Sequence, residues 1–168
     1  MVRKIIAFFV VFLFLGCVAT RNEYEKLRFM ENKFSIKPNT NENVYKLIDT
    51  TKVYELYDAV DTLSNKSLYS IKKQFLKFYN NGRVAEFDCF DKNDIKSLDS
   101  KKAKMAFYNF EKELIIQFYF EHPQGGGLIK SKFLKSNKES IELLSGNVLS
   151  KYKIIELPKE FLIYKPDW

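Results

Sequence analysis

The sequence predicts an all-β fold, an antiparallel up-and-down meander of eight or nine short strands that closes, or nearly closes, into a barrel. Apolar and polar side chains alternate in short runs, as in Leu114, Ile116, Phe118 and Phe120, which would share one face of a strand. Turn residues separate these runs at intervals of about 8–12 residues, and helical periodicity is nearly absent. Closure is expected because a closed barrel has no exposed edge strand to promote aggregation.

Turn signals place the expected strands in order along the chain. Asn80–Gly82 predicts a tight hairpin, because Asn and Gly tolerate the positive φ that such a turn requires. Asp91–Lys102 is polar and His122–Gly127 is rich in glycine, so both are expected to be loops. The expected strands are 50–57, 70–79, 83–90, 105–110, 113–121, 128–135, 140–144, 148–157 and 161–164.

The strand that follows the Asn-Gly turn has two different faces. Ala85, Phe87 and Cys89 fall on one face, and Glu86 and Asp88 fall on the other. Because Cys89 shares the apolar face, it is expected to be a buried and unreactive thiol.

The first seventeen residues are typical of an export signal. Arg3 and Lys4 precede the unbroken apolar run Ile5–Leu15, and Gly16 follows directly before Cys17. As a helix this run would extend roughly 18 Å, well short of the hydrocarbon core of about 30 Å, so it is a poor permanent membrane span.

The ending Leu15-Gly16-Cys17 resembles a bacterial lipobox, which implies that Cys17 is lipidated on sulfur and becomes the new N-terminus. Phe14 departs from the pattern, which usually has Leu three residues before the cysteine. The resemblance implies a diacylglyceryl thioether with a further acyl chain such as palmitate, and two or more chains anchor a protein stably. A plain signal peptide and an uncleaved anchor are the alternatives. If Cys17 carries lipid, Cys89 is the only other thiol and no internal disulfide can form.

These signals divide the chain into a signal peptide at 1–16, a lipidated cysteine and tether at 17–43, and a β domain at 44–168. Within the tether, Asn22–Met30 is a candidate short helix, because Asn22 can cap it. Loss of the signal peptide lowers the formal charge from +7 to +5, since it contains two basic residues and no acids. The remaining lysines are scattered among acids, so nucleic acid is not an expected partner. Anionic lipid headgroups would attract well-placed basic residues by about 1 kcal/mol each.

No arrangement of residues predicts catalysis or a cofactor. His122 is the only histidine, which excludes a two-histidine metal site. A dyad of His122 with Cys89 would join a turn residue to a buried strand residue. Gly125–Gly127 lacks the Lys-Ser/Thr pair that follows the glycines of a phosphate-binding loop. The chain is therefore not expected to be an enzyme, and no metal or cofactor is expected.

Three segments, Asp49–Tyr54, Phe75–Val84 and Leu157–Trp168, are similar to small bacterial lipoproteins with a lipocalin-like domain. The resemblance implies a lipocalin-like barrel held by its lipid on a membrane of the bacterial cell envelope, with the outer membrane as the expected location. It implies no reaction. The Gly-x-Trp signature that true lipocalins carry on their first strand is missing, and the only tryptophan is Trp168.

Two functions are compatible with these features. The aromatic residues of the strands would either line a pocket for a small apolar ligand or fill the barrel. Lys130 with Lys132, and Lys151 with Lys153, would form a basic stripe toward a membrane or an acidic partner, or keep an exposed face soluble. The first hypothesis is a membrane-anchored, monomeric carrier of a small apolar ligand. The alternative is an envelope lipoprotein that docks on a protein partner through an exposed apolar patch.

Overall fold

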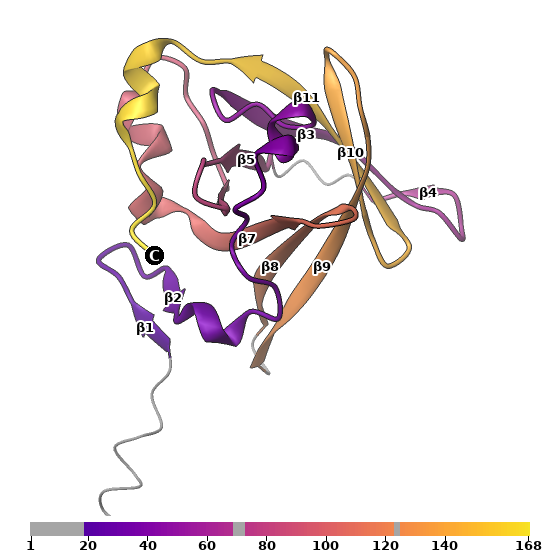
Figure 1. Ribbon diagram of the computed structural model, residues 1–168, viewed down its shortest axis with the longest axis horizontal. Helices are drawn as coiled ribbons and strands as arrows, with labels where there is room; N and C mark the ends of the chain where they lie inside the picture. The colour runs from indigo at the N-terminus through magenta and orange to yellow at the C-terminus, as the bar shows by residue number, and fades with distance from the viewer. Residues whose placement is uncertain (1–18, 69–72, 123–124) are drawn as a thin grey trace, which may run out of the picture.

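The computed structural model describes residues 19–68, 73–122 and 125–168, and within them it confirms the predicted all-β architecture. Eight antiparallel strands follow one another around a closed barrel, and the last strand pairs with the first (Figure 1). This is the up-and-down arrangement of a lipocalin-like barrel. The barrel strands are β3 (Lys52–Asp61), β5 (Phe75–Phe78), β6 (Arg83–Phe87), β7 (Lys104–Phe110), β8 (Leu114–His122), β9 (Gly125–Ser136), β10 (Ser140–Ser145) and β11 (Val148–Glu156).

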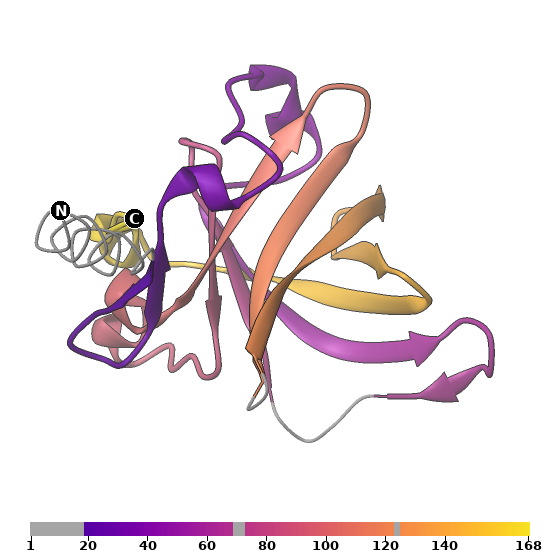
Figure 2. The same ribbon diagram turned by 90° about the horizontal axis from the view of Figure 1, so that it is seen from below.

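Strand β3 extends beyond its neighbour β5. β11 pairs with the whole of β3, whereas β5 pairs only with Tyr54 and Glu55. The far end of β3 pairs instead with the short extra strand β4 (Lys66–Ser67). The β3–β4 hairpin therefore projects sideways from the barrel, as Figure 2 shows.

Glycines occupy two close approaches in the sheet. Gly82 lies in the predicted Asn-Gly hairpin between β5 and β6 and has a φ of 77°. Gly126 lies in β9, which begins at Gly125, so the loop expected at 122–127 is shorter than predicted. A Cβ on Gly126 would lie 1.9 Å from the hydroxyl oxygen of Tyr119 and 2.6 Å from the carbonyl oxygen of Phe120, and the backbone carbonyl leaves room only for glycine.

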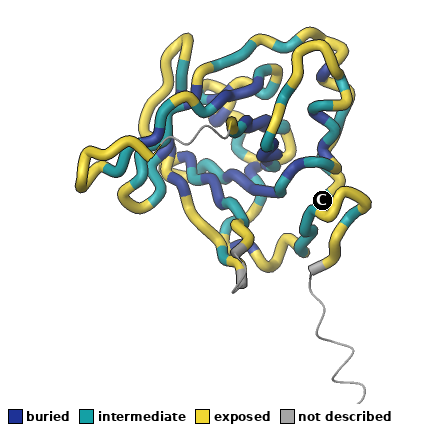
Figure 3. The backbone as a smooth tube through the Cα atoms, turned by 180° about the vertical axis from the view of Figure 1, so that it is seen from behind, coloured by how far each residue is buried: buried dark blue, intermediate teal, exposed yellow. Residues whose placement is uncertain are grey.

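One end of the barrel, the closed end, is plugged by apolar side chains. The 3₁₀ helix η2 (Glu42–Lys46) lies over this end and buries Val44 completely, with Ile48 beside it. The rings of Tyr54 and Phe78 fill the interior of the barrel, edge to face, with centroids 5.2 Å apart. Figure 3 shows buried residues along the barrel strands and exposed residues at the turns.

A second apolar core lies on the outside of the barrel. Phe75, Ala85 and Phe87 of β5 and β6 are buried there beneath three short helices. These helices are η3 (Ile95–Leu98), η4 (Ser100–Lys102) and η5 (Lys159–Ile163). A strand at 161–164 was expected, but this prediction is wrong, because Phe161 belongs to η5 and is buried in the outer core.

The N-terminal part of the described chain is a hairpin, and the short helix expected at Asn22–Met30 is absent from it. The carboxamide oxygen of Asn22 accepts hydrogen bonds from the N–H groups of Tyr24 and Lys26, both 3.0 Å long. The residue expected to cap a helix therefore closes a turn. The elements of this segment are β1 (Ala19–Arg21), β2 (Leu27–Phe29) and η1 (Glu31–Lys33).

The stretch expected to act mainly as a tether is held against the barrel. The ring centroids of Phe29 and Tyr119 lie 4.2 Å apart, and those of Phe34 and Phe107 lie 4.4 Å apart. Phe34 is buried by this contact. The predicted signal peptide and Cys17 lie outside the described residues. Within the described ranges, no helix has the length and hydropathy needed to cross a membrane.

Candidate functional site

A cavity of about 890 Å³ lies inside the barrel at the end opposite to Val44. Strands β6 to β11 line it, and the Tyr24–Lys26 turn of the N-terminal hairpin lies at its mouth. We call it the open-end cavity. Its volume falls in the range of about 300–1,000 Å³ that is typical of small-molecule sites.

One part of the cavity wall is apolar. Phe118 of β8, Ile129 of β9, Leu143 of β10 and Val148 of β11 line it. Phe120 continues this wall toward the mouth, where its side chain is 42% exposed. Because neighbouring strands each contribute a side chain, the apolar surface continues around this side of the barrel.

Another part of the wall is charged. The ammonium of Lys104 lies 2.8 Å from Oε1 of Glu86 and 3.2 Å from Oδ1 of Asp88. The ammonium of Lys26 lies 3.3 Å from the other carboxylate oxygen of Asp88. Two positive and two negative side chains therefore alternate in one row, of which Lys26, Glu86 and Lys104 line the cavity and Asp88 does not. The acids Glu25 and Glu121 line the cavity as well.

Neutral polar groups accompany this row. The hydroxyl of Tyr152 donates a hydrogen bond of 3.1 Å to the side-chain oxygen of Gln74. The hydroxyls of Ser131 and Ser145 bond to each other across β9 and β10. The cavity thus contains both donors and acceptors beside its apolar wall.

The environment of the cavity shifts the pKa values of three groups. Burial lowers the pKa of Lys104, but Glu86 and Asp88 outweigh burial and raise the pKa overall. Burial raises the pKa of Asp88, but Lys104 and Lys26 lower it overall. Burial and the charge of Glu86 both raise the pKa of the Tyr152 hydroxyl. At neutral pH a charged Lys104 and an un-ionised Tyr152 therefore line the cavity, and the charged Asp88 lies beside Lys104.

The sequence did not identify Glu86 and Lys104 as interior residues. Alternation in β6 predicts one buried apolar face, and the structure buries that face in the outer core. Val84 and Glu86 therefore lie on the face that points into the barrel. The β6–β7 register, which sets Glu86 opposite Lys104, is the signal that could have found this pair.

The aromatic residues inside the barrel divide between the two roles that were considered, whereas Phe75, Phe87 and Phe107 pack on its outside. Tyr54, Phe78 and Tyr108 fill the closed end, where the ring centroids of Phe78 and Tyr108 lie 5.6 Å apart. Phe118 and Tyr152 instead line the open-end cavity. The barrel is filled at one end and hollow at the other.

Cys89 is exposed, so the prediction of a buried thiol is wrong. β6 ends at Phe87, and beyond the last strand residue the alternation no longer determines burial. The side chain of His122 and the whole of Cys17 lie outside the part of the chain that the structure describes. Among the side chains it does describe, no group of three or more His, Cys, Asp or Glu is placed to hold a metal ion.

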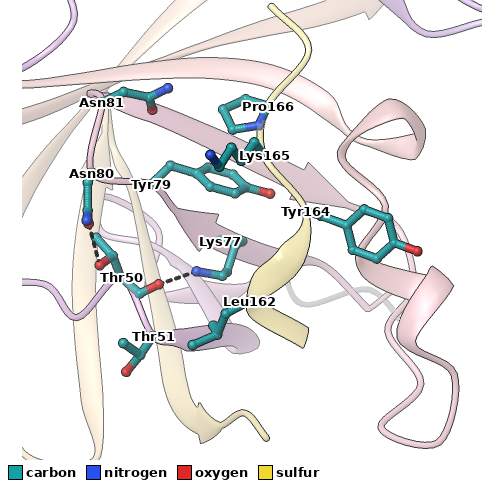
Figure 4. Close-up of a pocket in the computed structure, with 10 residues that line it drawn as sticks. All are labelled: Thr50, Thr51, Lys77, Tyr79, Asn80, Asn81, Leu162, Tyr164, Lys165 and Pro166. Atoms are coloured by element: carbon teal, nitrogen blue, oxygen red, sulfur yellow. Dashed lines mark hydrogen bonds between the residues drawn. The ribbon is translucent and has the colours of Figure 1, made fainter. Parts of the chain in front are cut away.

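A second hollow, of about 370 Å³, lies outside the barrel beside the C-terminal segment 162–166 (Figure 4). The ammonium of Lys77 donates hydrogen bonds to the carbonyl oxygens of Thr50 and Phe78, the latter at 3.1 Å. Burial lowers the pKa of Lys77 to about 8, partly opposed by the charge of Asp49. Because the ammonium already binds carbonyls of its own chain, this hollow is a weaker candidate for a ligand site.

No protein-family model matches the chain, and no curated protein or solved structure is significantly similar to it. The open-end cavity is therefore interpreted from its own geometry.

Proposed function

We propose that this protein is a membrane-anchored bacterial lipoprotein whose barrel binds a small amphipathic molecule in the open-end cavity. The observation that carries the proposal is the cavity of about 890 Å³ inside a barrel whose other end is plugged. A barrel of eight strands is wide enough to hold one small ligand when its side chains leave room.

The two kinds of cavity wall support an amphipathic ligand. The wall of Phe118, Ile129 and Leu143 would bury an apolar group, at about 25 cal/mol for each Å² removed from water. The polar wall of Glu86, Lys104 and Gln74 would be desolvated by a purely apolar ligand, which is unfavourable. A ligand with both an apolar part and a hydrogen-bonding part matches both walls.

The proposed anchor at Cys17 is supported by the leader sequence. Its two basic residues, apolar run and Gly16-Cys17 ending have the order of a lipoprotein signal. We place the mature protein on the outer membrane of the cell envelope, where several acyl chains would hold it stably.

Native mass spectrometry of the folded protein tests ligand binding. We expect wild-type protein purified in mild detergent to retain a small molecule. Ser150→Trp, on the cavity-facing side of β11, should remove this mass by filling the site. Leu149→Trp, the adjacent residue on the other face of the same strand, is the matched control and should retain it. Equal retention by the two variants, or no retained mass in wild type, would refute the proposal.

Docking on an envelope protein is the second candidate function. The observation that favours it is the β3–β4 hairpin, which projects from the barrel with Leu63 78% exposed and Leu68 51% exposed. A Leu63→Ser variant would then lose an envelope protein that co-purifies with wild type. If wild type and variant capture the same proteins, this hairpin is not the docking surface.

A further inference from the structure

The described chain begins very close to the proposed anchor. Only Val18 separates Cys17 from Ala19, the first residue of β1. Two residues of extended chain span at most about 7 Å. Lipid on Cys17 would therefore hold the start of β1 at the headgroup layer of the membrane.

β1 is not free to swing away from the barrel, because its hairpin is fastened at several points. The guanidinium of Arg28 lies 2.9 Å from the carboxylate of Asp167 and donates a 3.1 Å hydrogen bond to the carbonyl oxygen of Ala103. The side chain of Asn22 donates a 2.6 Å hydrogen bond to the carbonyl oxygen of Lys101. An anchor two residues before β1 would therefore orient the whole barrel, and not only the hairpin.

The N-terminal hairpin lies beside β7 and the outer end of β8, with which β9 pairs. Arg21 of β1 lies 3.8 Å from Glu121 of β8. In Figure 1 the start of β1 and the outer ends of β8 and β9 reach the same lower side of the molecule. These strand ends would be the nearest part of the barrel to an anchoring membrane.

This end of the barrel exposes large apolar side chains. Phe120 is 42% exposed, Leu128 is 37% exposed and Ile129 is 40% exposed. We call these three residues the β8–β9 lip. Two basic residues accompany the lip, Arg21 on β1 and the exposed Lys130 on β9.

We infer that the β8–β9 lip rests in the interfacial layer of the lipid bilayer, so that the open-end cavity exchanges its ligand with that bilayer. The inference rests on the proposed lipid anchor. Phe120 and Ile129 belong to both the lip and the cavity wall, so apolar surface continues from the membrane into the cavity. Lys130 would add about 1 kcal/mol of attraction to anionic headgroups, whereas the charge of Arg21 is balanced by Glu121 beside it.

A lipid surface fits the lip better than a protein partner does. A stable protein interface usually buries about 800 Å² on each side, which three half-exposed side chains do not supply. The lip would not have to provide the affinity for a bilayer, because the acyl chains already hold the protein there. The lip needs only to orient the barrel on the bilayer.

Fluorescent reporters on the full, lipidated chain test this orientation. Leu128→Cys places a reporter on the lip, and Leu63→Cys is the matched control, since Leu63 is an exposed leucine on the hairpin that projects away from β1. Both carry Cys89→Ser, which removes the exposed native thiol. Each protein is labelled with an environment-sensitive dye and reconstituted into vesicles of phosphatidylethanolamine and phosphatidylglycerol, and the vesicles are then floated.

We expect the dye at position 128 to shift its emission to the blue, to be quenched by spin-labelled lipid and to lose its quenching by iodide. The dye at position 63 should remain quenched by iodide. If the protein floats with vesicles but both dyes stay in water, the anchor is present and the inference is wrong. If the protein does not float, the anchor itself is refuted, and the inference with it. A blue shift in native membranes but not in pure lipid would mean that a protein covers the lip, which also overturns the inference.

Discussion

Replacing the buried lysine of β5 gives the most quantitative test of the structure. Lys77 is only 5% exposed, and burial lowers the pKa of its ammonium from 10.5 to about 8. The folded protein therefore binds this proton more weakly than the unfolded chain does. Since one pH unit corresponds to about 1.4 kcal/mol, the charged lysine opposes folding by about 3 kcal/mol below pH 8.

The sign of the pH dependence follows from this difference. Between pH 8 and pH 10.5 the unfolded chain keeps the proton that the folded protein has lost, so the free energy of unfolding rises with pH. Between pH 7 and pH 9.5 the expected gain from this site is about 2 kcal/mol. Lys77→Met has no charge to titrate and should lack the gain.

At pH 7 two effects of Lys77→Met oppose each other. Methionine removes the charge penalty of about 3 kcal/mol. It also leaves the carbonyl oxygens of Thr50 and Phe78 without their donor, which costs about 1–3 kcal/mol for each buried group left unpaired. The net change at pH 7 therefore lies between a gain of about 1 and a loss of about 3 kcal/mol, so the pH dependence is the diagnostic quantity.

Urea unfolding followed by circular dichroism measures this quantity for both proteins at pH 7 and pH 9.5. Other titrating groups cancel in the difference between wild type and Lys77→Met. Lys151→Met is the control, because Lys151 lies on the outer face beside Asp58, which raises the pKa of the lysine. If the free energy of unfolding of wild type minus that of Lys77→Met does not increase between pH 7 and pH 9.5, Lys77 is not buried as described.

Three further perturbations have clear expected outcomes. Cys89 should react fully with a maleimide in the native protein, since it is exposed, and a requirement for denaturant in the mass-spectrometric assay would contradict this. Lys104→Met should lower the free energy of unfolding by about 1–3 kcal/mol, because Glu86 loses its partner, and adding Glu86→Gln should recover part of the loss in urea unfolding. Gly126→Ala should destabilise the barrel by about 1–3 kcal/mol, because the new Cβ meets the backbone carbonyl of Phe120, and an unchanged melting temperature would count against the described β8–β9 approach.

The sequence predicted the barrel because strand alternation and turn chemistry are local. Each barrel strand has one side in the interior, so runs such as that of Leu114 and Ile116 carry the pattern directly. The Asn-Gly turn before Arg83 likewise fixes its hairpin through backbone preferences alone. Both signals can be recognised without knowing which distant parts of the chain lie beside them.

The errors occur where distant contacts decide between local alternatives. Asn22 can cap a helix or close a turn, and the docking of Phe29 against Tyr119 favours the hairpin. Phe161 can extend a strand or enter a 3₁₀ turn, and the outer core favours the turn. The same outer core covers the apolar face of β6. An interpretation that assumes a single core, inside the barrel, therefore places Glu86 on the outside, although it lines the cavity.

The difference between the two ends of the barrel supports a binding role over a purely structural one. The closed end shows that this chain can fill the barrel with apolar residues, such as Val44 and Phe78. The open end instead contains the ion pair of Glu86 and Lys104 beside a large hollow. The Lys104 side chain of this pair is 35% exposed, and partly exposed ion pairs usually contribute less than about 1 kcal/mol, so stability alone does not account for a charged and hollow open end. The proposed ligand, in contact with both the charged row and the apolar wall, would give the hollow a function that packing does not.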